Sequence, residues 1–263
     1  MRKKDFSVQV LVSTMHQTDF SLLETMNIKT SAVVVNQCDS DSVKEFMYRG
    51  NTIKWINSTE RGVGKSRNTA LLNATGDILL FADEDVVFVD DVEQLVVDYF
   101  CSSKSDLAVF NYISLNPDRP EKITKRNHNL HLWNCLGYGA FRIAVNRDRL
   151  FKKNIYYSLL FGGGAKYQAG EDNLFITQCI KNHMKCTASD NVLGTVAQKE
   201  STWFNGYNDQ YYMDRGALFA AMYGKASIIM LILFELKHFS KFSISNLSYE
   251  LEGRKLFLSN SNV

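Results

Sequence analysis

Three acidic residues stand directly after an apolar run, where their carboxylates can meet on one cation. Residues 78–81 are Ile-Leu-Leu-Phe, and Asp83, Glu84 and Asp85 follow after a single alanine. Carboxylates at i and i+2 can converge, and their oxygens suit hard divalent ions such as Mg²⁺ or Mn²⁺. Acidic residues also favour the start of a helix, so capping of the next helix is the alternative. Acids beside a buried run are costly unless they are paired, which favours a metal site at Asp83 and Asp85.

A second acidic pair, Glu171 and Asp172, begins a helical pattern. Apolar residues follow at i, i+3 and i+4 from Ile176, as on the buried face of a helix. Taken alone, the pair is typical of a helix start. However, it follows a glycine run at 162–164, which can lie against a ligand without side-chain clashes. A carboxylate presented there can take a proton from an attacking hydroxyl.

A Gly-Lys-Ser sequence at 64–66 lies between an apolar run and a helical pattern, which is the setting of a phosphate-binding loop. That loop needs a glycine five residues before Gly64, where this chain has Thr59. The acidic run also comes too soon afterwards, so a nucleoside-triphosphatase is the weaker alternative. Backbone amides at this helix start, with Arg67 nearby, still suit a phosphate or a base carbonyl. For Lys65, a plain helix start with a solvated side chain is an equal alternative.

Short apolar runs alternate with helical patterns in the first half of the chain, which predicts an α/β fold with a mostly parallel sheet. Strands are expected at 8–12, 32–35, 53–56, 78–81, 107–110 and 140–145, and helices at 22–26, 43–47, 66–74 and 92–100. Such sheets bind ligands at the carboxyl ends of their strands. Polar residues just after the runs, such as Ser13, Asn36 and Gln37, are therefore expected to face a ligand.

The composition fits a folded chain of one domain with a short extension. The chain has 263 residues, 45% of them hydrophobic, which is ample for a core. Acids and bases nearly balance at a net charge of +2, which argues against nucleic-acid binding. The five cysteines are scattered and form no CxxC pair, which indicates reduced thiols in the cytosol rather than disulfides or a zinc site.

Taken together, these motifs resemble inverting glycosyltransferases of family 2, which have the GT-A fold. The resemblance runs from the first expected strand to about Tyr212. It is most specific over 62–85, where a Gly/Ser-Arg-Asn helix precedes Ala-x-Gly-Asp and an apolar strand that ends in Asp-x-Asp. The sequence Gly-Glu-Asp at 170–172 matches the family's later Glu-Asp motif. Each motif alone is weak, but their order and spacing are specific.

The resemblance implies transfer of a sugar, with inversion, from a UDP- or similar nucleotide sugar to a hydroxyl of a glycan or glycolipid. It implies Mg²⁺ or Mn²⁺ on Asp83 and Asp85, where the ion neutralises the leaving diphosphate. Asp172 is the implied general base, with Glu171 as a support or acceptor contact. The implied setting is bacterial surface polysaccharide synthesis in the cytoplasm. A non-catalytic member of the fold is a third alternative, and the retained carboxylates argue against it.

Two positions depart from the family pattern. Asn36 and Gln37 stand where relatives often have two aspartates, and amides can still pair with a base edge. Gln198 stands where many relatives have a metal-ligating histidine, and a neutral amide is a poorer ligand. The residues expected at the donor nucleotide are Ser13, Asn36, Gln37, Asp39, Arg67 and Asp83.

The prolines at 117 and 120 mark a seam in the chain. We expect a nucleotide-sugar-binding half at 1–115, an acceptor-binding half of the same domain at 116–212, and a C-terminal helical extension at 213–263. The extension contains an apolar run at 226–234, too short for the roughly 20 residues that span a bilayer.

This run has two interpretations. It forms either a helix packed on the domain or an interfacial helix whose apolar face enters a membrane. In the second case Lys225, Lys237, His238 and Lys241 would lie near lipid head groups at the inner face of the cell membrane. An enzyme with a lipid-linked acceptor would benefit from such a contact.

Overall fold

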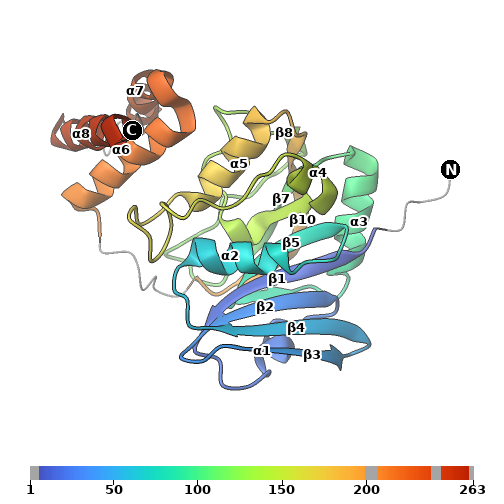
Figure 1. Ribbon diagram of the computed structural model, residues 1–263. Helices are drawn as coiled ribbons and strands as arrows, with labels where there is room; N and C mark the ends of the chain where they lie inside the picture. The colour runs from blue at the N-terminus through green and yellow to red at the C-terminus, as the bar shows by residue number, and fades with distance from the viewer. Residues whose placement is uncertain (1–5, 199–205, 238–243, 261–263) are drawn as a thin grey trace.

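A computed structural model describes residues 6–198, 206–237 and 244–260 of the chain. It has an α/β architecture, with a central sheet between helices and a group of helices at the C-terminal end (Figure 1). The strands are β1 (Val8–Met15), β2 (Ser31–Gln37), β3 (Ser42–Tyr48), β4 (Asn51–Ser58), β5 (Ile78–Asp83), β6 (Val86–Phe88), β7 (Leu107–Ser114), β8 (His128–Asn129), β9 (Ile143–Asn146) and β10 (Cys186–Val196). The helices are α1 (Leu22–Thr25), α2 (Val63–Leu72), α3 (Val92–Ser103), α4 (Arg147–Lys152), α5 (Glu171–Lys181), α6 (Asp209–Tyr223), α7 (Ser227–Lys237) and α8 (Ile244–Asn260), with 3₁₀ turns η1 (Ala140–Arg142) and η2 (Gly224–Ala226).

The strand order in the described part of the sheet is β3-β4-β2-β1-β5-β9-β7-β10-β6, with β8 paired to β10. Strands β4, β2, β1 and β5 are parallel, so their carboxyl ends meet at one edge. There Ser13 of β1 lies in register with Asp83 of β5. The sheet as a whole is mixed, because β3, β6, β8 and β9 run antiparallel to their neighbours. The α/β fold is confirmed, and the mostly parallel character holds for the half that carries the acidic triplet.

The prediction of a helix at 43–47 is wrong, because these residues form the middle of β3. The strand pairs with β4 along its whole length, from Ser42 opposite Asn57 to Tyr48 opposite Asn51. Arg49 and Gly50 join the two strands with φ values of +50° and +80°. Positive φ at both central residues is the backbone of the tight hairpin turn that matches strand twist. Pairing with β4 therefore overrides the helical spacing of the apolar residues.

Smaller differences concern element boundaries. The helix expected at 66–74 begins earlier, at Val63, and the strand expected at 140–145 is divided into η1 and β9. The expected helices at 22–26 and 92–100 correspond to α1 and α3. Strands β6 and β10 were not predicted from the sequence. They pair with each other, and Gln198, just after β10, reaches Asp85 of the acidic triplet.

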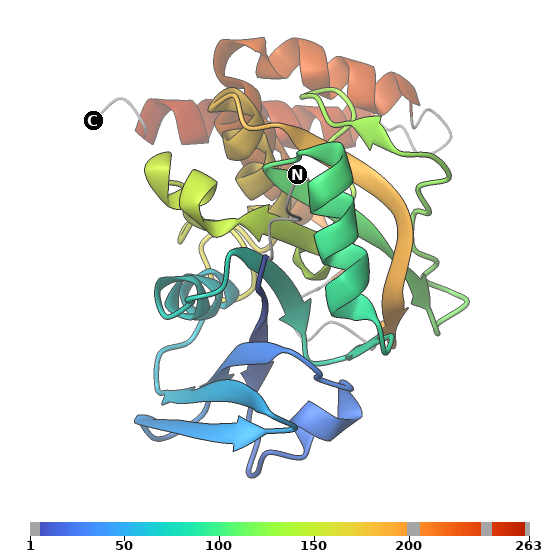
Figure 2. The same cartoon turned by 90° about the vertical axis from the view of Figure 1, so that its right-hand side faces the viewer.

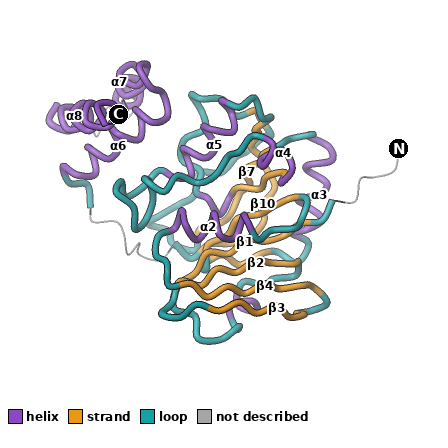
Figure 3. The backbone as a smooth tube through the Cα atoms, in the orientation of Figure 1, coloured by secondary structure: helices purple, strands orange, loops and turns teal. Residues whose placement is uncertain are grey.

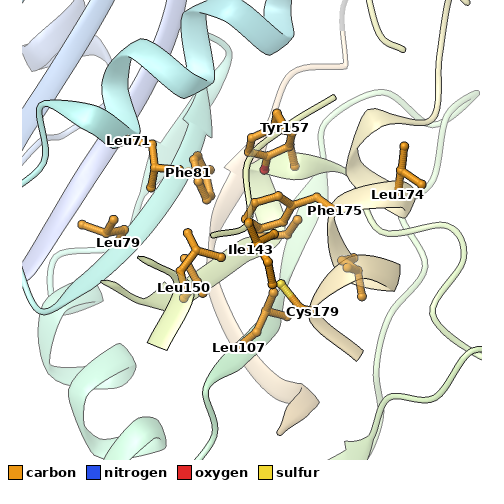
Figure 4. Close-up of a cluster of buried hydrophobic side chains, with 14 of the residues drawn as sticks. Leu71, Leu79, Phe81, Leu107, Ile143, Leu150, Tyr157, Leu174, Phe175 and Cys179 are labelled. Atoms are coloured by element: carbon orange, nitrogen blue, oxygen red, sulfur yellow. The ribbon is translucent and has the colours of Figure 1, made fainter. Parts of the chain in front are cut away.

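Apolar side chains alternate along the strands and build one core on each face of the sheet. In Figure 2, α2 and α4 lie on one side of the strands and α1 on the other. In the first core, Phe81 of β5, Tyr157 and Phe175 of α5 pack together (Figure 4). The Tyr157 and Phe175 rings stack at 4.3 Å, and Phe81 meets Tyr157 edge-on at 5.1 Å. Since Phe81 precedes Asp83 and Phe175 follows Glu171, this packing fixes the two acidic segments relative to each other.

Helices α6, α7 and α8 gather beside α5, apart from the strands (Figure 3). Helices α6 and α8 cross closely at Gly216, where an added Cβ would lie 1.9 Å from the carbonyl oxygen of Glu250. Arg215 of α6 pairs with Glu235 of α7 and with Glu250 of α8. A C-terminal helical part is thus confirmed, while the proposed boundaries at 115 and 212 stay predictions.

The expected helix at 226–234 corresponds to α7. Leu231 is buried, whereas Ile229, Leu233 and Leu236 are more than half exposed. Within the described residues, the stretch from Asp209 to Leu236 is long and apolar enough to cross a membrane by length and composition alone. It is interrupted by η2, and 39% of its apolar window is buried against the protein. Of the basic residues expected near lipid, His238 and Lys241 lie outside the described residues.

Candidate active site

A cleft of about 770 Å³ opens at the carboxyl ends of β1 and β5, facing the start of α5. It is lined by most of the residues that the sequence predicted: Ser13, Gln37, Arg67, Asp83, Asp85, Glu171 and Asp172. Asn36 and Asp39 are not part of its lining. The fold therefore joins the two acidic segments, which are far apart in the chain, in one site.

Arg67 of α2 connects these two acidic segments. Its guanidinium donates to Asp83 at 2.9 Å and to Glu171 at 2.7 Å. The side chain is only 6% exposed and lies over the Tyr157 ring at 5.4 Å. The two carboxylates raise the pKa of Arg67 despite its burial, so it stays charged. Arg67 thus fixes Glu171 and one side of Asp83, whereas Asp172 forms no ion pair with a basic side chain among the described residues.

Glu84 is held away from the other two acids of the triplet. Its carboxylate accepts hydrogen bonds from the Thr14 hydroxyl and, at 3.2 Å, from the Met15 backbone amide. The Gln17 amide also donates to it, at 3.3 Å. These bonds tie the carboxyl end of β1 and the segment after it to the end of β5. Glu84 is therefore a support of the cleft wall, which leaves Asp83 and Asp85 as the candidate cation ligands of the triplet.

Asp85 accepts a hydrogen bond from the Gln198 backbone amide at 3.0 Å. Burial, and next the charge of Asp83, raise the pKa of Asp85 above its usual value. The Gln198 side-chain amide donates to Glu121, and the backbone carbonyl of Gln198 accepts from the Asn116 side-chain amide. Gln198 therefore orients Asp85 through its backbone, and its side chain is engaged elsewhere.

The cleft has an excess of negative charge that suits a cation. The described residues that line it include five with carboxylate side chains and one with a basic side chain, Arg67. The described residues contain no group of three or more His, Cys, Asp or Glu side chains arranged to hold a metal. Asp83 and Asp85 still provide hard oxygen ligands beside open space. Mg²⁺ commonly binds through one or two carboxylates, with phosphate and water completing its shell, so the two residues fit a divalent ion.

Asp172 lies in the first turn of α5, and its carboxylate accepts from the Asn173 backbone amide at 2.6 Å. Burial, and next the charge of Glu171, raise the pKa of Asp172 to about 7. The Asn173 side chain accepts from the backbone amide of Gly137 at 3.1 Å, which ties a neighbouring loop to α5. A carboxylate with a pKa near the working pH is suited to accept a proton.

The glycine run before α5 allows a close approach of backbone and side chains. At Gly162, φ is +106°, and an added Cβ would lie 2.8 Å from Val63 and 2.9 Å from the Glu171 carboxyl carbon. The Gly163 carbonyl accepts from the Val63 amide at 3.0 Å and so joins this loop to the start of α2. These contacts place Glu171 within reach of Arg67. The expectation that the run lies against a ligand remains a prediction, and Gly163 does line the cleft.

Two of the residues expected at the donor, Asn36 and Asp39, are bonded to other parts of the protein and do not line the cleft. Asn36 is fully buried, and its amide is bonded to the Gln17 backbone and to the Asn57 side chain. It therefore has no free edge for a base, and its role is to hold the segment after β1. Asp39 pairs with Arg61 at 2.8 Å, and its side chain is 93% exposed outside the cleft.

Gln37 and Ser13 line the cleft but also have partners in the protein. The Gln37 carbonyl oxygen accepts from the Gly62 backbone amide at 2.8 Å. Ser13 accepts from the Ser66 hydroxyl at 3.0 Å. Both interactions join the strand ends to the start of α2.

In the Gly-Lys-Ser loop, Lys65 and Gly64 are engaged with other parts of the protein. Lys65 pairs with Glu60 at 3.5 Å and does not line the cleft. An added Cβ at Gly64 would lie 2.6 Å from the Ser158 carbonyl oxygen, so this glycine serves packing. The loop gives no support to the triphosphatase alternative.

Sequence reasoning missed part of the cleft. Thr14, Gln17, Ser21 and Thr25 line it between β1 and α1, and Gln168 lines it before α5. Thr14 stands next to Ser13 at the carboxyl end of β1, where the sequence did predict residues that face a ligand. The others lie in loops or on a four-residue helix, where no local pattern reports which side chain turns inward.

Comparisons with known proteins agree with this geometry. The family model described as Glycosyl transferase family 2 matches residues 15–161. Glycosyltransferase GlyA of Streptococcus pneumoniae serotype 4 is 32% identical over 148 residues, which are 52% of this chain and 20% of GlyA. The present chain thus spans about a fifth of the length of that relative.

The solved structures that resemble this chain share its fold at low sequence identity. S. aureus TarS 1-349 in complex with UDP-GlcNAc has a TM-score of 0.64 at 16% identity, over 94% of this chain and 79% of that one. The mannosyltransferase PcManGT from Pyrobaculum calidifontis, in complex with GDP-Man and Mn²⁺, has a TM-score of 0.54 at 14% identity, over 96% and 79%. Since the family model covers more than half of the chain and the fold agrees, this protein belongs to glycosyltransferase family 2 and has the GT-A fold.

Proposed function

We propose that this chain transfers a sugar from a nucleotide sugar to a hydroxyl of a glycan or lipid-linked acceptor, with inversion and with a divalent cation. The observation that carries the proposal is the double ion pair of Arg67 with Asp83 and Glu171. It brings the acidic strand end, suited to a cation and a diphosphate, beside the helix start that carries Asp172. A donor and an acceptor can therefore meet in one cleft.

The relatives support a nucleotide-sugar donor. TarS has been solved with UDP-GlcNAc and with UDP, and PcManGT with GDP-Man. A UDP-sugar is our first candidate for this chain. The nucleoside would lie between β1 and α1, where Thr14, Gln17 and Thr25 line the cleft. The diphosphate would lie toward Asp83 and Asp85.

Asp83 and Asp85 would hold the divalent cation, Mg²⁺ or Mn²⁺. When bound, the ion would neutralise the charge of the leaving diphosphate. The excess of carboxylates in the cleft supports this role, because an anionic diphosphate would otherwise be repelled. Gln198 would act by orienting Asp85 and would not be a ligand, since its side chain is bonded to Glu121.

Asp172 would be the general base. As the acceptor oxygen forms its bond to the anomeric carbon, the bond from that carbon to the diphosphate breaks, and Asp172 takes the acceptor proton. Attack from the face opposite the leaving group inverts the anomeric centre. Glu171 is engaged by Arg67 and would act as a support.

We also propose that the protein works in the cytoplasm, at the inner face of the cell membrane, in bacterial surface polysaccharide synthesis. The exposed apolar residues of α7, namely Ile229, Leu233 and Leu236, support a peripheral membrane contact.

The proposal is tested with a panel of UDP- and GDP-sugars, each with Mn²⁺, Mg²⁺ or EDTA. A bound donor raises the melting temperature by mass action, and slow donor hydrolysis reports turnover without a known acceptor. We expect one donor to stabilise the protein and to be hydrolysed only with a cation. Asp85→Asn should abolish hydrolysis at an unchanged melting temperature of the free protein, and Asp39→Asn is the matched control outside the cleft. Full activity in EDTA would exclude the cation, and donor binding without any turnover or transfer would favour a non-catalytic binding protein.

A further inference from the structure

A second cavity, of about 380 Å³, lies behind the start of α5. Helices α6 and α7 and the loop at 136–137 enclose it. Five of its lining side chains are large and mainly apolar: Leu136, Tyr211, Leu218, Phe219 and Phe234. Its volume is in the range of small-molecule sites in proteins, which bury most of a ligand behind apolar walls.

This cavity shares a wall with the proposed active-site cleft. Gln168, Ala169, Gly170 and Asn173 line both spaces. Asp172 stands on the same turn of α5, between Gly170 and Asn173. A molecule with its reacting hydroxyl at Asp172 can therefore extend its neighbouring part over this wall into the second cavity.

The wall is closely built, and its polar groups are bonded within the protein. At Gly170, φ is +101°, and an added Cβ would lie 2.4 Å from a methyl group of Leu218. The Gln168 backbone amide donates to Asp214 at 2.9 Å, and the Gln210 side chain donates to the other oxygen of Asp214. Arg215 is paired with the glutamates of α7 and α8. The polar groups at the rim thus have partners, and the cavity offers mainly hydrocarbon contacts.

We infer that this cavity binds the hydrocarbon part of an amphiphilic acceptor, next to the hydroxyl that Asp172 would activate. The inference rests on the proposed function and selects the lipid-linked acceptor over a free glycan. Hydrocarbon gains free energy when it leaves water for such a space. A free glycan would bury hydroxyls there without hydrogen-bond partners, which is costly.

The helix that contributes Phe234 to the cavity also carries exposed apolar residues. Phe234 of α7 lines the cavity, and on the same helix Ile229, Leu233 and Leu236 are exposed to solvent. A chain longer than the cavity can therefore continue along apolar side chains rather than into water. A lipid anchored in a membrane would reach the active site from this side.

Direct binding of two simple glycosides tests the assignment, without donor and without knowledge of the natural acceptor. The probes are n-octyl β-D-glucoside, below its micelle concentration, and methyl β-D-glucoside, both measured by calorimetry. Each buried methylene can strengthen binding by up to about fourfold. We expect saturable binding of the octyl glucoside and at least about tenfold weaker binding of the methyl glucoside.

The variant Leu136→Trp fills the cavity from a half-buried loop position and should weaken octyl glucoside binding by at least about tenfold. The matched control is Leu115→Trp, at an exposed position that does not line the cavity. If Leu136→Trp changes the melting temperature, Phe234→Ser serves as the second variant, because it makes the wall polar without filling the space. Equal binding of both glucosides, or octyl binding that survives both cavity variants, would overturn the assignment.

Failure of the proposed function gives a different result. Donor binding and donor hydrolysis do not depend on the second cavity and should be unchanged in Leu136→Trp. If the wild-type protein binds octyl glucoside but neither binds nor hydrolyses any nucleotide sugar, the cavity assignment stands and the transferase proposal fails. If donor hydrolysis is normal and octyl glucoside does not bind, the reverse holds.

Discussion

At the scale of single residues, Arg67 determines how the two acidic segments are held together. Arg67→Met would leave Asp83 and Glu171, whose side chains are 36% and 13% exposed, without their partner. Breaking a fully buried pair typically costs about 3 to 5 kcal/mol, and access of solvent to Asp83 reduces this to about 1 to 3 kcal/mol. We expect a loss of that order in the free energy of unfolding, measured in urea, and loss of donor hydrolysis. Arg67→Lys keeps the charge but cannot bridge both carboxylates, so it should recover part of the stability and little of the activity. Normal stability of Arg67→Met would contradict this role.

The general base gives a second prediction at this scale. Asp172→Asn should reduce transfer by about 10²- to 10⁴-fold with little change in donor affinity, because it removes the proton acceptor. Glu171→Gln should cost less, since Arg67 and not the substrate is its main partner. Rates and donor dissociation constants of both variants are the measurement. Near-normal turnover in Asp172→Asn would transfer the role to Glu171, whereas collapse of donor binding would place Asp172 in the donor pocket.

The pH dependence gives a third prediction. Burial and the neighbouring Glu171 raise the pKa of Asp172 to about 7, and a base must be ionised to act. In the free enzyme, kcat/KM should therefore fall as the pH decreases through about 7, and Asp172→Asn should lack this limb. The positive charge of Arg67 lowers the pKa of Asp172, so Arg67→Lys, with its charge farther away, should move the limb to higher pH. A limb near pH 4 in the wild-type protein would contradict the raised pKa.

How much of the site could be read from the sequence depends on where each partner lies. Asp83, Asp85 and Asp172 follow a strand or open a helix, so local patterns located them. Asn36 also follows a strand run, but its amide is taken by Gln17 and Asn57, which only the folded chain brings near. The bond between Gln198 and Glu121 likewise joins residues 77 positions apart. Local patterns thus indicate which residues reach the edge of the sheet, and tertiary contacts determine which of them remain free.

At the scale of elements, the loop before α5 must approach α2 closely enough for Glu171 to reach Arg67. Gly162→Ala would place a Cβ against Val63 and the Glu171 carboxyl group, in addition to the strain of a positive φ. We expect a loss of transfer of at least about tenfold, through displaced Glu171. The matched control is Gly50→Ala in the β3–β4 turn, where φ is +80° and no atom lies within 4 Å of the added Cβ. Equal transfer activity of the two variants would show that the contact between the added Cβ and Glu171 does not affect transfer.

The same distinction between local and tertiary information holds for whole elements. Parallel strands β1, β2 and β5 were predictable because each contains a short, continuous apolar run buried on both faces. The edge strand β3 was not, because its exposed sequence Ser-Val-Lys-Glu-Phe-Met-Tyr has no such run and its apolar residues also fit helical spacing. Its pairing with β4 and the turn at Arg49 and Gly50 decide the outcome.

At the scale of the whole molecule, the proposed membrane contact of the C-terminal helices can be tested separately from their role in the fold. Truncation after Gly224 is a poor test, because α7 and α8 supply the partners of Arg215 and the buried Leu231. Removing them would expose the inner face of α6 at the same time as it deletes the outer face of α7. Surface substitutions that leave the buried side of α7 intact separate the two effects.

The double variant Ile229→Glu and Leu233→Glu places two charges on the exposed face of α7, where the side chains are 63% and 54% exposed. The control is Val43→Glu and Met47→Glu on the edge strand β3, at 60% and 65% exposure, with the same change in charge. We expect the wild-type protein and the control to float with phosphatidylglycerol liposomes and the α7 variant to remain in solution, because charged groups do not enter the acyl region. Circular dichroism should give the same thermal transition for all three, since both substituted faces are solvent-exposed. If the α7 variant floats as well as the control, α7 is not the membrane contact, and if the wild-type protein does not float, its apolar face packs against another protein surface instead.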